Sequence, residues 1–378
     1  MTAAFADKIN GAPRGFFMNK RQIDYIILVI TILLVVFGLI ELASASSGLG
    51  KIQFNNPYYY LEHQIMYGIS LGLLGFFSAL YIPYKVWKKI SPVLLGINVL
   101  MILLLFTHLG VDAGGAERWL RIGKLAFQPT EFLKITLVLY LSSWLSSGRA
   151  DRKGIQEGLI PFVSIVGFIS LMLLLQHSTS AMVMLLVGAT AVYFVGGAKT
   201  KYILYVGGAA AAILVLAVLI TPYRMQRILT FLHPNQNTSG AAYQINQSLI
   251  TIGSGGFWGV GYGQSQTKEY LPARINDAIF AVIAEEFGFI GATILILAYL
   301  FYITRCFLLA KETRDPFGRL VLVGFATIIG AQTFIHVGAT SGLIPLTGVP
   351  LPYISYGGSS LAAFMTMSGL MLNISRSA

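Results

Sequence analysis

Residues 251–288 read TIGSGGFWGVGYGQSQTKEYLPARINDAIFAVIAEEFG, a glycine-rich and aromatic-rich stretch that leads into a long apolar run. Asp277 stands at the head of that run. Before this stretch the chain alternates between apolar segments and short charged ones, so it is the longest part that must lie outside a bilayer and still remain close to it. We therefore interpret it as the centre of the functional site.

The composition of the chain indicates a membrane protein. Hydrophobic residues make up 56% and charged residues 11% of the 378 residues, and the mean hydropathy is +0.72. A helix needs roughly 20 apolar residues to cross a bilayer, and such runs recur along almost the whole length. The sequence predicts an all-α polytopic membrane protein, a single transmembrane domain over residues 1–378 without a sizeable soluble part.

Ten apolar segments are expected to form the membrane spans, since each has the length and composition of a transmembrane helix. They lie at residues 25–46, 64–82, 90–109, 130–146, 158–176, 180–196, 202–221, 278–304, 318–340 and 357–375.

The short loops give the orientation, because Lys and Arg are retained on the cytoplasmic side. Most loop cations fall on one face, which predicts a cytoplasmic tail at residues 1–24, both termini inside, and a large extracytoplasmic loop at residues 222–276. The loop VDAGGAERWLRIGKLAFQPTE at residues 111–131 breaks this pattern with Arg118, Arg121 and Lys124 on the outer face. Those cations indicate either an anionic ligand or contacts with lipid phosphates.

Neither a metal site nor a nucleotide site is predicted. The single cysteine, Cys306, excludes an intrachain disulfide and a Cys-rich metal centre, and the 5 histidines lack metal-ligand spacing. The glycines of residues 253–263 resemble a phosphate-binding loop only superficially, because no strand precedes them and no Gly-Lys-Ser/Thr follows. We expect no cofactor, and dependence on a divalent cation stays open.

Asp277 admits two interpretations. It precedes an apolar helix, where a carboxylate would cap the helix and complement its dipole, or it is a functional acid. Glu285 and Glu286 follow about 12–14 Å along the same predicted helix, at a depth where carboxylates are costly. At about 100° per residue only Glu285 could share a pocket with Asp277, because Glu286 points away.

Two other segments bring polar groups to the same face. Glu131 and Lys134 are three residues apart at the start of a span, close enough for an ion pair that either starts the helix or frames a polar cavity. The segment HVGATSGLIPLTGVPLPYISYGGSSL at residues 336–361 contains three prolines, which forbid a continuous helix. Non-helical backbone at a membrane needs cover from protein or water, so we expect this segment to cap a cavity.

Four motifs occur in order along nearly the whole chain. They are ERWLRIG…FQPTEFLKI from residue 117, YQINQSLITIGSGGFWGVGYG from residue 243, EYLPARINDAIFAVIAEEFGFIG from residue 269 and ISYGGSSL from residue 354. In these the chain resembles the SEDS family of cell-shape, division and sporulation proteins, typified by RodA and FtsW. The resemblance implies a peptidoglycan glycosyltransferase that polymerises lipid II at the outer face of the cytoplasmic membrane, together with a class B penicillin-binding protein.

The resemblance also assigns residues. It makes Asp277 the family's essential acid, Glu131 and Lys134 its ion pair, and Arg118 and Trp119 its Arg-Trp loop pair. Two positions depart from the family pattern. Ile275-Asn276 stands before Asp277 where His-Thr is usual, and Ser178 stands where the family commonly has the acid of a Pro-Asp-x-Gly motif.

The implied chemistry suits these residues. A carboxylate such as Asp277 is a suitable general base for a sugar hydroxyl that attacks an anomeric carbon bearing a lipid diphosphate. Fixed cations should stabilise the leaving diphosphate. The residues expected to bind substrate are Arg118, Trp119, Arg121, Lys124, Glu131, Lys134, Arg274, Ser355, Tyr356, Gly357 and Ser359.

Two alternatives belong to other functional classes. Buried acids and a proline-broken span would also suit a transporter of lipid-linked precursors. The serine at position 178 would suit a non-catalytic activator of the partner synthase. The sequence leaves open whether the chain serves division or elongation.

Overall fold

The structure, a computed structural model, describes residues 22–377 except 108–109, 113–116, 123–124, 149–153 and 233–239. Each of the ten predicted spans contains a helix in the described residues, which confirms the polytopic all-α class. The helices are α1 (Tyr25–Phe54), α2 (Tyr59–His63), α3 (Ser70–Tyr81), α4 (Tyr84–Leu104), α5 (Pro129–Leu145), α6 (Ile160–Leu175), α7 (Thr179–Val195), α8 (Thr200–Ile220), α9 (Pro222–Leu232), α10 (Ala241–Ser254), α11 (Ile279–Glu312), α12 (Pro316–Thr340) and α13 (Gly358–Ser375). Short π-helical turns at Gln64–Ile69 and Ile155–Leu159 lead into α3 and α6.

Seven helical stretches in the described part of the chain are long and apolar enough to cross a membrane by themselves, with Tyr59–Tyr81 and Ile155–Leu175 each counted as one stretch that includes its π-helical turn. α5 and α7 are shorter, with 17 residues each, and α5 is buried along most of its length. Central helices of this kind face other helices instead of lipid. The burial of α5 therefore explains how a segment with Glu131 and Lys134 can occupy the middle of the bundle.

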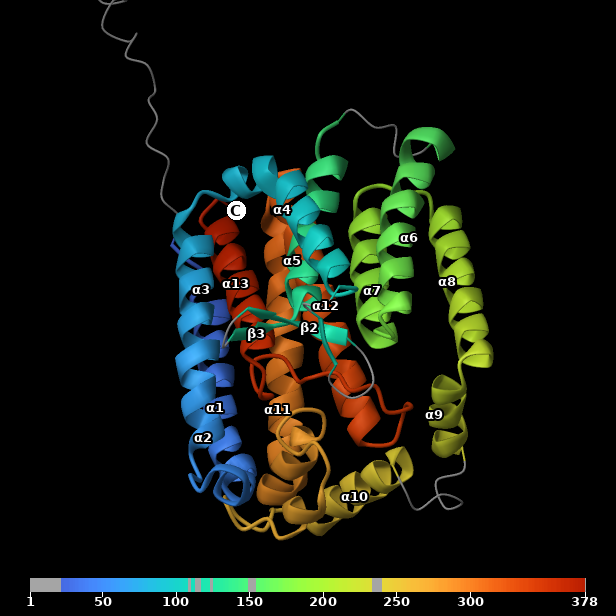
Figure 1. Ribbon diagram of the computed structural model, residues 1–378. Helices are drawn as coiled ribbons and strands as arrows, with labels where there is room; N and C mark the ends of the chain where they lie inside the picture. Colours follow the sequence, from blue (N-terminus) through green and yellow to red (C-terminus); the bar gives the residue numbers. More distant parts are fainter. Residues whose placement is uncertain are drawn as a thin grey trace, which may run out of the picture.

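The bundle has a buried centre and an exposed edge (Figure 1). α13 packs against α3, and α12 packs against α11, α7 and α5. α8 lies at the edge and only Tyr202 of its residues is buried. The two ends of the described chain meet at one end of the bundle, where the Asp24 backbone N–H donates to Ser375 Oγ at 3.1 Å. α9 and α10 lie towards the opposite end.

A small antiparallel sheet interrupts the helical pattern. β1 (Gly110–Asp112), β2 (Glu117–Ile122) and β3 (Leu125–Phe127) pair in the order β1-β2-β3. The sequence analysis predicted a loop here. Successive side chains of a strand point to opposite faces, so β2 directs Arg118 and Trp119 to different sides.

The predicted loop of residues 222–276 is partly helical. Its glycine-rich turn supplies hydrogen-bond partners to backbone groups where α11 is interrupted. Gly288 has φ +66° and interrupts the helix. The N–H groups of Val260 and Gly261 donate to the carbonyls of Glu285 and Glu286, both at 3.0 Å. Those of Phe289 and Ile290 donate to Gly256 at 2.9 Å and Phe257 at 3.3 Å. The loop thus satisfies backbone groups that a broken membrane helix would leave unpaired.

Close backbone approach explains the glycines in this turn. A Cβ on Gly259 would lie 2.2 Å from the Glu286 carbonyl oxygen, and one on Gly255 would lie 2.1 Å from that of Ala284. No larger residue fits without moving the loop away from α11.

Candidate active site

Asp277 lies in a turn before α11 and does not cap it. The N–H groups of Asn276, Asp277 and Ala278 all donate to the Ala273 carbonyl, at 3.0, 3.0 and 3.2 Å. The N-cap residue is Ala278, and it makes no side-chain cap bond. The capping interpretation of Asp277 is therefore wrong, because α11 begins one residue later than a cap at Asp277 requires. The carboxylate is thus available for another role.

The Asp277 carboxylate faces a cavity of about 510 Å³ between α5, α7, α9 and the proline-rich segment. The lining residues with polar side chains are Arg118, Gln128, Glu131, His177, Ser178, Thr179, Ser180, Arg224, Arg227, Asp277 and Thr347. Three arginines and two carboxylates thus surround one space. A phosphorylated or otherwise anionic ligand fits this balance of charge.

Burial raises the pKa of Asp277 above its ordinary value, and the cations Arg227 and Arg118 partly offset that effect. Arg118 also donates to the His177 carbonyl oxygen at 2.7 Å, and Arg227 to that of Leu346 at 2.9 Å. Both guanidinium groups are therefore held in place at the cavity. A half-buried carboxylate with a raised pKa beside fixed cations is a typical arrangement for a general base.

Gly348 forms the wall next to Asp277. It has φ +65°, and a Cβ there would lie 3.4 Å from Asp277 Oδ2. The backbone of the proline-rich segment therefore approaches the carboxylate closely. This confirms that the segment is non-helical and covers a cavity.

Glu131 and Lys134 form the predicted ion pair at the inner end of the cavity. Lys134 Nζ lies 2.8 Å from both Glu131 carboxylate oxygens and 2.8 Å from Gln332 Oε1 on α12. Lys134 is fully buried and also lies over the ring of Phe364. The pair thus links α5 to α12, and Glu131 itself reaches the cavity.

A second, apolar cavity of about 650 Å³ adjoins this region. Trp119, Phe127, Phe132 and Tyr356 line it, together with residues of α3 and α4. Because successive side chains of β2 point to opposite faces of the sheet, Arg118 faces the polar cavity and Trp119 faces the apolar one. The sheet therefore separates a charged compartment from an apolar compartment.

Comparison with known proteins identifies the family. The model of the FtsW, RodA and SpoVE family, described as "Cell cycle protein", matches residues 24–378. The chain belongs to this family. The resemblance stated from the motifs is thereby confirmed.

Relatives of this family are similar over nearly their full length. The probable peptidoglycan glycosyltransferase FtsW of Geobacter sp. (strain M18) is 35% identical over 354 residues, which cover 93% of this chain and 96% of that protein. Stage V sporulation protein E of Bacillus subtilis (strain 168) is 33% identical over 360 residues, 95% of this chain and 98% of that protein.

Solved structures of the family have the same fold. A chain from a peptidoglycan synthase complex that coordinates polymerization and crosslinking has a TM-score of 0.79 at 29% identity, covering 94% of this chain and 98% of that one. The rod shape determining protein RodA of Thermus thermophilus has a TM-score of 0.68 at 26% identity, covering 95% of this chain and 98% of that one.

Not every cation expected from the family motifs reaches the polar cavity. Arg274 is buried elsewhere, with Nη1 at 2.6 Å from the Lys268 carbonyl and 2.9 Å from Glu269. Arg121 is exposed and does not line the cavity, because β2 turns it away from the Arg118 side. Lys124 lies outside the described residues.

Arg224 and Arg227 on α9 take the place of those cations. The sequence analysis placed both in the large loop without assigning them to the site, since about fifty residues separate them from Asp277. The spacing of the two arginines could have indicated that they act together. The two arginines are three residues apart, and such a pair shares one helical face.

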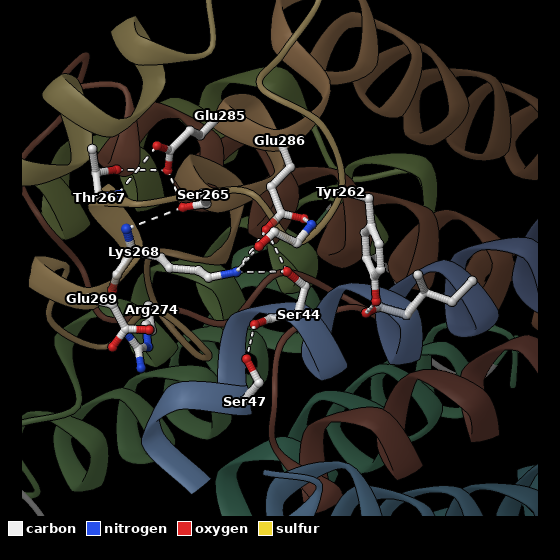
Figure 2. A network of polar contacts seen from close by, with 12 residues as sticks. Ser44, Ser47, Tyr262, Ser265, Thr267, Lys268, Glu269, Arg274, Glu285 and Glu286 are labelled. Atoms are coloured by element: carbon white, nitrogen blue, oxygen red, sulfur yellow. Dashed lines mark hydrogen bonds and ion pairs between the residues drawn. The ribbon is translucent and has the colours of Figure 1, made fainter. Parts of the chain in front are cut away.

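The expectation that Glu285 shares the Asp277 pocket is wrong. Glu285 accepts bonds from Ser265 and Thr267, and Glu286 pairs with Lys268 at 3.2 Å (Figure 2). Both glutamates thus anchor the large loop, and neither lines the cavity. The helical-wheel angle failed because Asp277 lies in a turn and not on the helix.

The residues of the SYGGS motif form hydrogen bonds to the segments that surround the site. Ser355 Oγ donates to the Asn276 carbonyl at 2.6 Å, and the Tyr356 N–H to that of Ile275 at 2.9 Å. The Gly357 N–H donates to Gln64 Oε1 at 3.1 Å, while Ser359 Oγ accepts from the Gln128 N–H at 3.1 Å. The contacts of Ser355 and Tyr356 fix the backbone before Asp277. Tyr356, Gly357 and Ser359 face the apolar cavity and not the polar one.

Ser178, where the resemblance implied an acid, lies in the polar cavity. It is buried, and its hydroxyl has no hydrogen-bond partner among the described residues. The neighbouring His177 adopts φ +56°, which turns its carbonyl towards Arg118. The cavity therefore holds a serine hydroxyl at the position where the resemblance implied a carboxylate. In the described residues no three His, Cys, Asp or Glu side chains gather as metal ligands would.

Proposed function

We propose that this chain polymerises lipid II into glycan strands at the outer face of the cytoplasmic membrane, with Asp277 as the general base. The observation that carries the proposal is the placement of Asp277, with its raised pKa, in a cavity beside Arg118 and Arg227. A base works best when its pKa lies near the operating pH. Burial moves Asp277 in that direction.

The reaction joins one sugar to another by a single displacement. Asp277 takes the proton of the attacking hydroxyl, the new bond forms at the anomeric carbon, and the bond to the lipid diphosphate breaks. The leaving diphosphate gains negative charge. Arg118, Arg224 and Arg227 supply fixed cations in a partly dry cavity, where such stabilisation is strongest.

The two adjoining cavities suit a substrate that is charged at one end and apolar at the other. The diphosphate and sugars would occupy the polar cavity, and the apolar cavity at Trp119 and Tyr356 would hold the start of the lipid chain. Glu131 would act from the wall of the polar cavity, and the buried Lys134 would hold its carboxylate in place.

A class B penicillin-binding protein is the proposed partner. The solved relative in a peptidoglycan synthase complex that coordinates polymerization and crosslinking supports this assignment. Side chains of α11 such as Phe289, Leu297 and Leu300 are exposed and apolar, as a surface against lipid or a partner's span would be.

The transporter and the non-catalytic activator are the alternatives to exclude. Purified protein is incubated with fluorescent lipid II, and the products are separated by size. Glycan strands made without any other polymerase support the enzyme. Movement of lipid II across a vesicle membrane without strands would support a transporter, and strands made only after a partner polymerase is added would support an activator.

A further inference from the structure

The proline-rich segment is held by side chains that reach its carbonyl oxygens. Arg227 donates to Leu346 at 2.9 Å, and Ser180 Oγ donates to Thr347 at 2.8 Å. From α11, Tyr299 donates to Pro352. These bonds come from α9, α7 and α11. A segment without helical bonds of its own thus takes its shape from the surrounding helices.

Two further donors come from one face of α12. Gln332 Nε2 donates to the Pro350 carbonyl at 2.8 Å, and His336 Nδ1 lies 2.7 Å from the Val349 carbonyl. The two residues are four apart, so they lie on consecutive turns. Since a carbonyl only accepts, the His336 Nδ1 atom carries the hydrogen in this contact. Adjacent carbonyls are therefore clamped by adjacent turns of a single buried helix.

The orientation of the Gln332 amide is imposed by the buried ion pair. Lys134 has only donors, so the Gln332 oxygen must face it, at 2.8 Å. The Gln332 NH₂ group is then directed to Pro350. Lys134 is in turn fixed by two contacts with Glu131. A continuous set of contacts therefore runs from Glu131 through Lys134 and Gln332 to the segment.

The carbonyls that these side chains hold directly follow Gly348, which lines the cavity next to the Asp277 carboxylate. Displacement of residues 349–350 would move this wall and change the environment of the base. Small displacements matter for catalysis, because a misplacement of about 1 Å can cost about 10²-fold in rate.

We propose that Gln332 and His336 are positioning residues, which hold residues 348–350 against Asp277 and through which the Glu131–Lys134 pair acts on the base. This inference rests on the proposed catalytic role of Asp277. It assigns the buried ion pair a task that needs no contact with substrate.

The test compares two disruptive variants with two matched ones. His336→Leu and Gln332→Met remove the donors and keep most of the side-chain volume. His336→Asn keeps a donor, because the Asn Nδ2 atom lies the same number of bonds from Cα as His Nδ1. Thr333→Val is the control on the same helix, since the Thr333 hydroxyl bonds only within α12, to Ile329 at 2.9 Å.

For His336→Leu and Gln332→Met we expect kcat for strand synthesis to fall by about 10- to 100-fold, with KM for lipid II within about threefold of wild type. His336→Asn and Thr333→Val should stay within about threefold in both constants. An equal loss in His336→Asn and His336→Leu, or no loss in the two disruptive variants, would overturn the proposal. If His336→Leu does not fold, Gln332→Met and His336→Asn decide.

Hydrogen exchange of the backbone provides a readout that does not depend on activity. In both disruptive variants the amides of residues 346–355 should exchange faster, whereas those of α13 should not change. If the wild type makes no strands, the proposed function fails. The exchange experiment still tests whether Gln332 and His336 hold residues 349–350 in place. Unchanged exchange at residues 346–355 would overturn that inference.

Discussion

Asp277 is subject to two opposed requirements, because a base must ionise and burial opposes ionisation. Its pKa is raised in the folded protein, so the unfolded chain loses this proton at a lower pH than the folded chain does. The contribution of Asp277 to stability therefore falls as pH rises from the unfolded to the folded pKa. Above that window the ionised group destabilises the fold, which is acceptable only if the charge serves function.

Asp277→Asn is expected to separate the two effects. The amide keeps the size of the side chain and removes the base, so strand synthesis should fall by about 10² to 10⁴. The midpoint of thermal unfolding at neutral pH should stay equal or rise, since a buried charge is removed. The single cysteine, Cys306, is buried, so a thiol-reactive fluorogenic dye reports unfolding in detergent. A rate within about threefold of wild type would end the claim that Asp277 is catalytic.

Arg227 sets how readily Asp277 ionises. Among the cations, Arg227 lowers the pKa of this carboxyl most, so Arg227→Met should raise that pKa further. The acid limb of the kcat/KM profile should then move to higher pH. Arg224→Met is the matched variant, because Arg224 lines the same cavity but is not among the cations that shift Asp277. An acid limb that moves equally in both variants, or moves in neither, would contradict this assignment.

At the scale of elements, the broken helix α11 explains why the loop is rich in glycine. Gly259→Ala should destabilise the protein, because its Cβ would lie 2.2 Å from the Glu286 carbonyl and its φ is +85°. Strain of this kind costs on the order of 1–3 kcal/mol. Gly253→Ala is the control, since Gly253 lies in α10 with open space around it. It should leave stability unchanged or raise it by about 0.5–1 kcal/mol.

The dye assay on Cys306 measures both glycine variants. A lower unfolding midpoint is expected for Gly259→Ala alone. Equal midpoints for the two variants would show that the loop does not depend on close contact with α11.

The same elements show what the sequence could predict. Apolar length located every span, and the spacing of Glu131 and Lys134 predicted their pairing, because both signals are local. The break at Gly288 stayed hidden, since a single glycine between two phenylalanines is compatible with a continuous helix. Arg224 and Arg227 reach the site only through the fold, which brings α9 next to the segment at Leu346. Contacts between residues far apart in the chain leave no periodic pattern to detect.

At the scale of the whole molecule, the placement of the loops rich in Lys and Arg predicts an orientation. The two ends of the described chain lie together, at the bond between Asp24 and Ser375, and α9 and α10 lie towards the other end (Figure 1). Lys and Arg are retained in the cytoplasm, and the loops rich in these residues are expected on the side of the termini. The polar cavity, with Asp277, would then open outside the cell, where glycan strands are needed.

Labelling of single cysteines in intact cells tests this orientation. In a Cys306→Ser background, Ser254→Cys places a thiol at the exposed end of α10, and Ser377→Cys places one at the exposed C-terminal end. A membrane-impermeant maleimide should label only the first, because the second faces the cytoplasm. Both should react after the cells are opened, which controls for accessibility. Labelling of Ser377→Cys alone in intact cells would show the opposite orientation. The cavity would then face the cytoplasm, where strands cannot be extended.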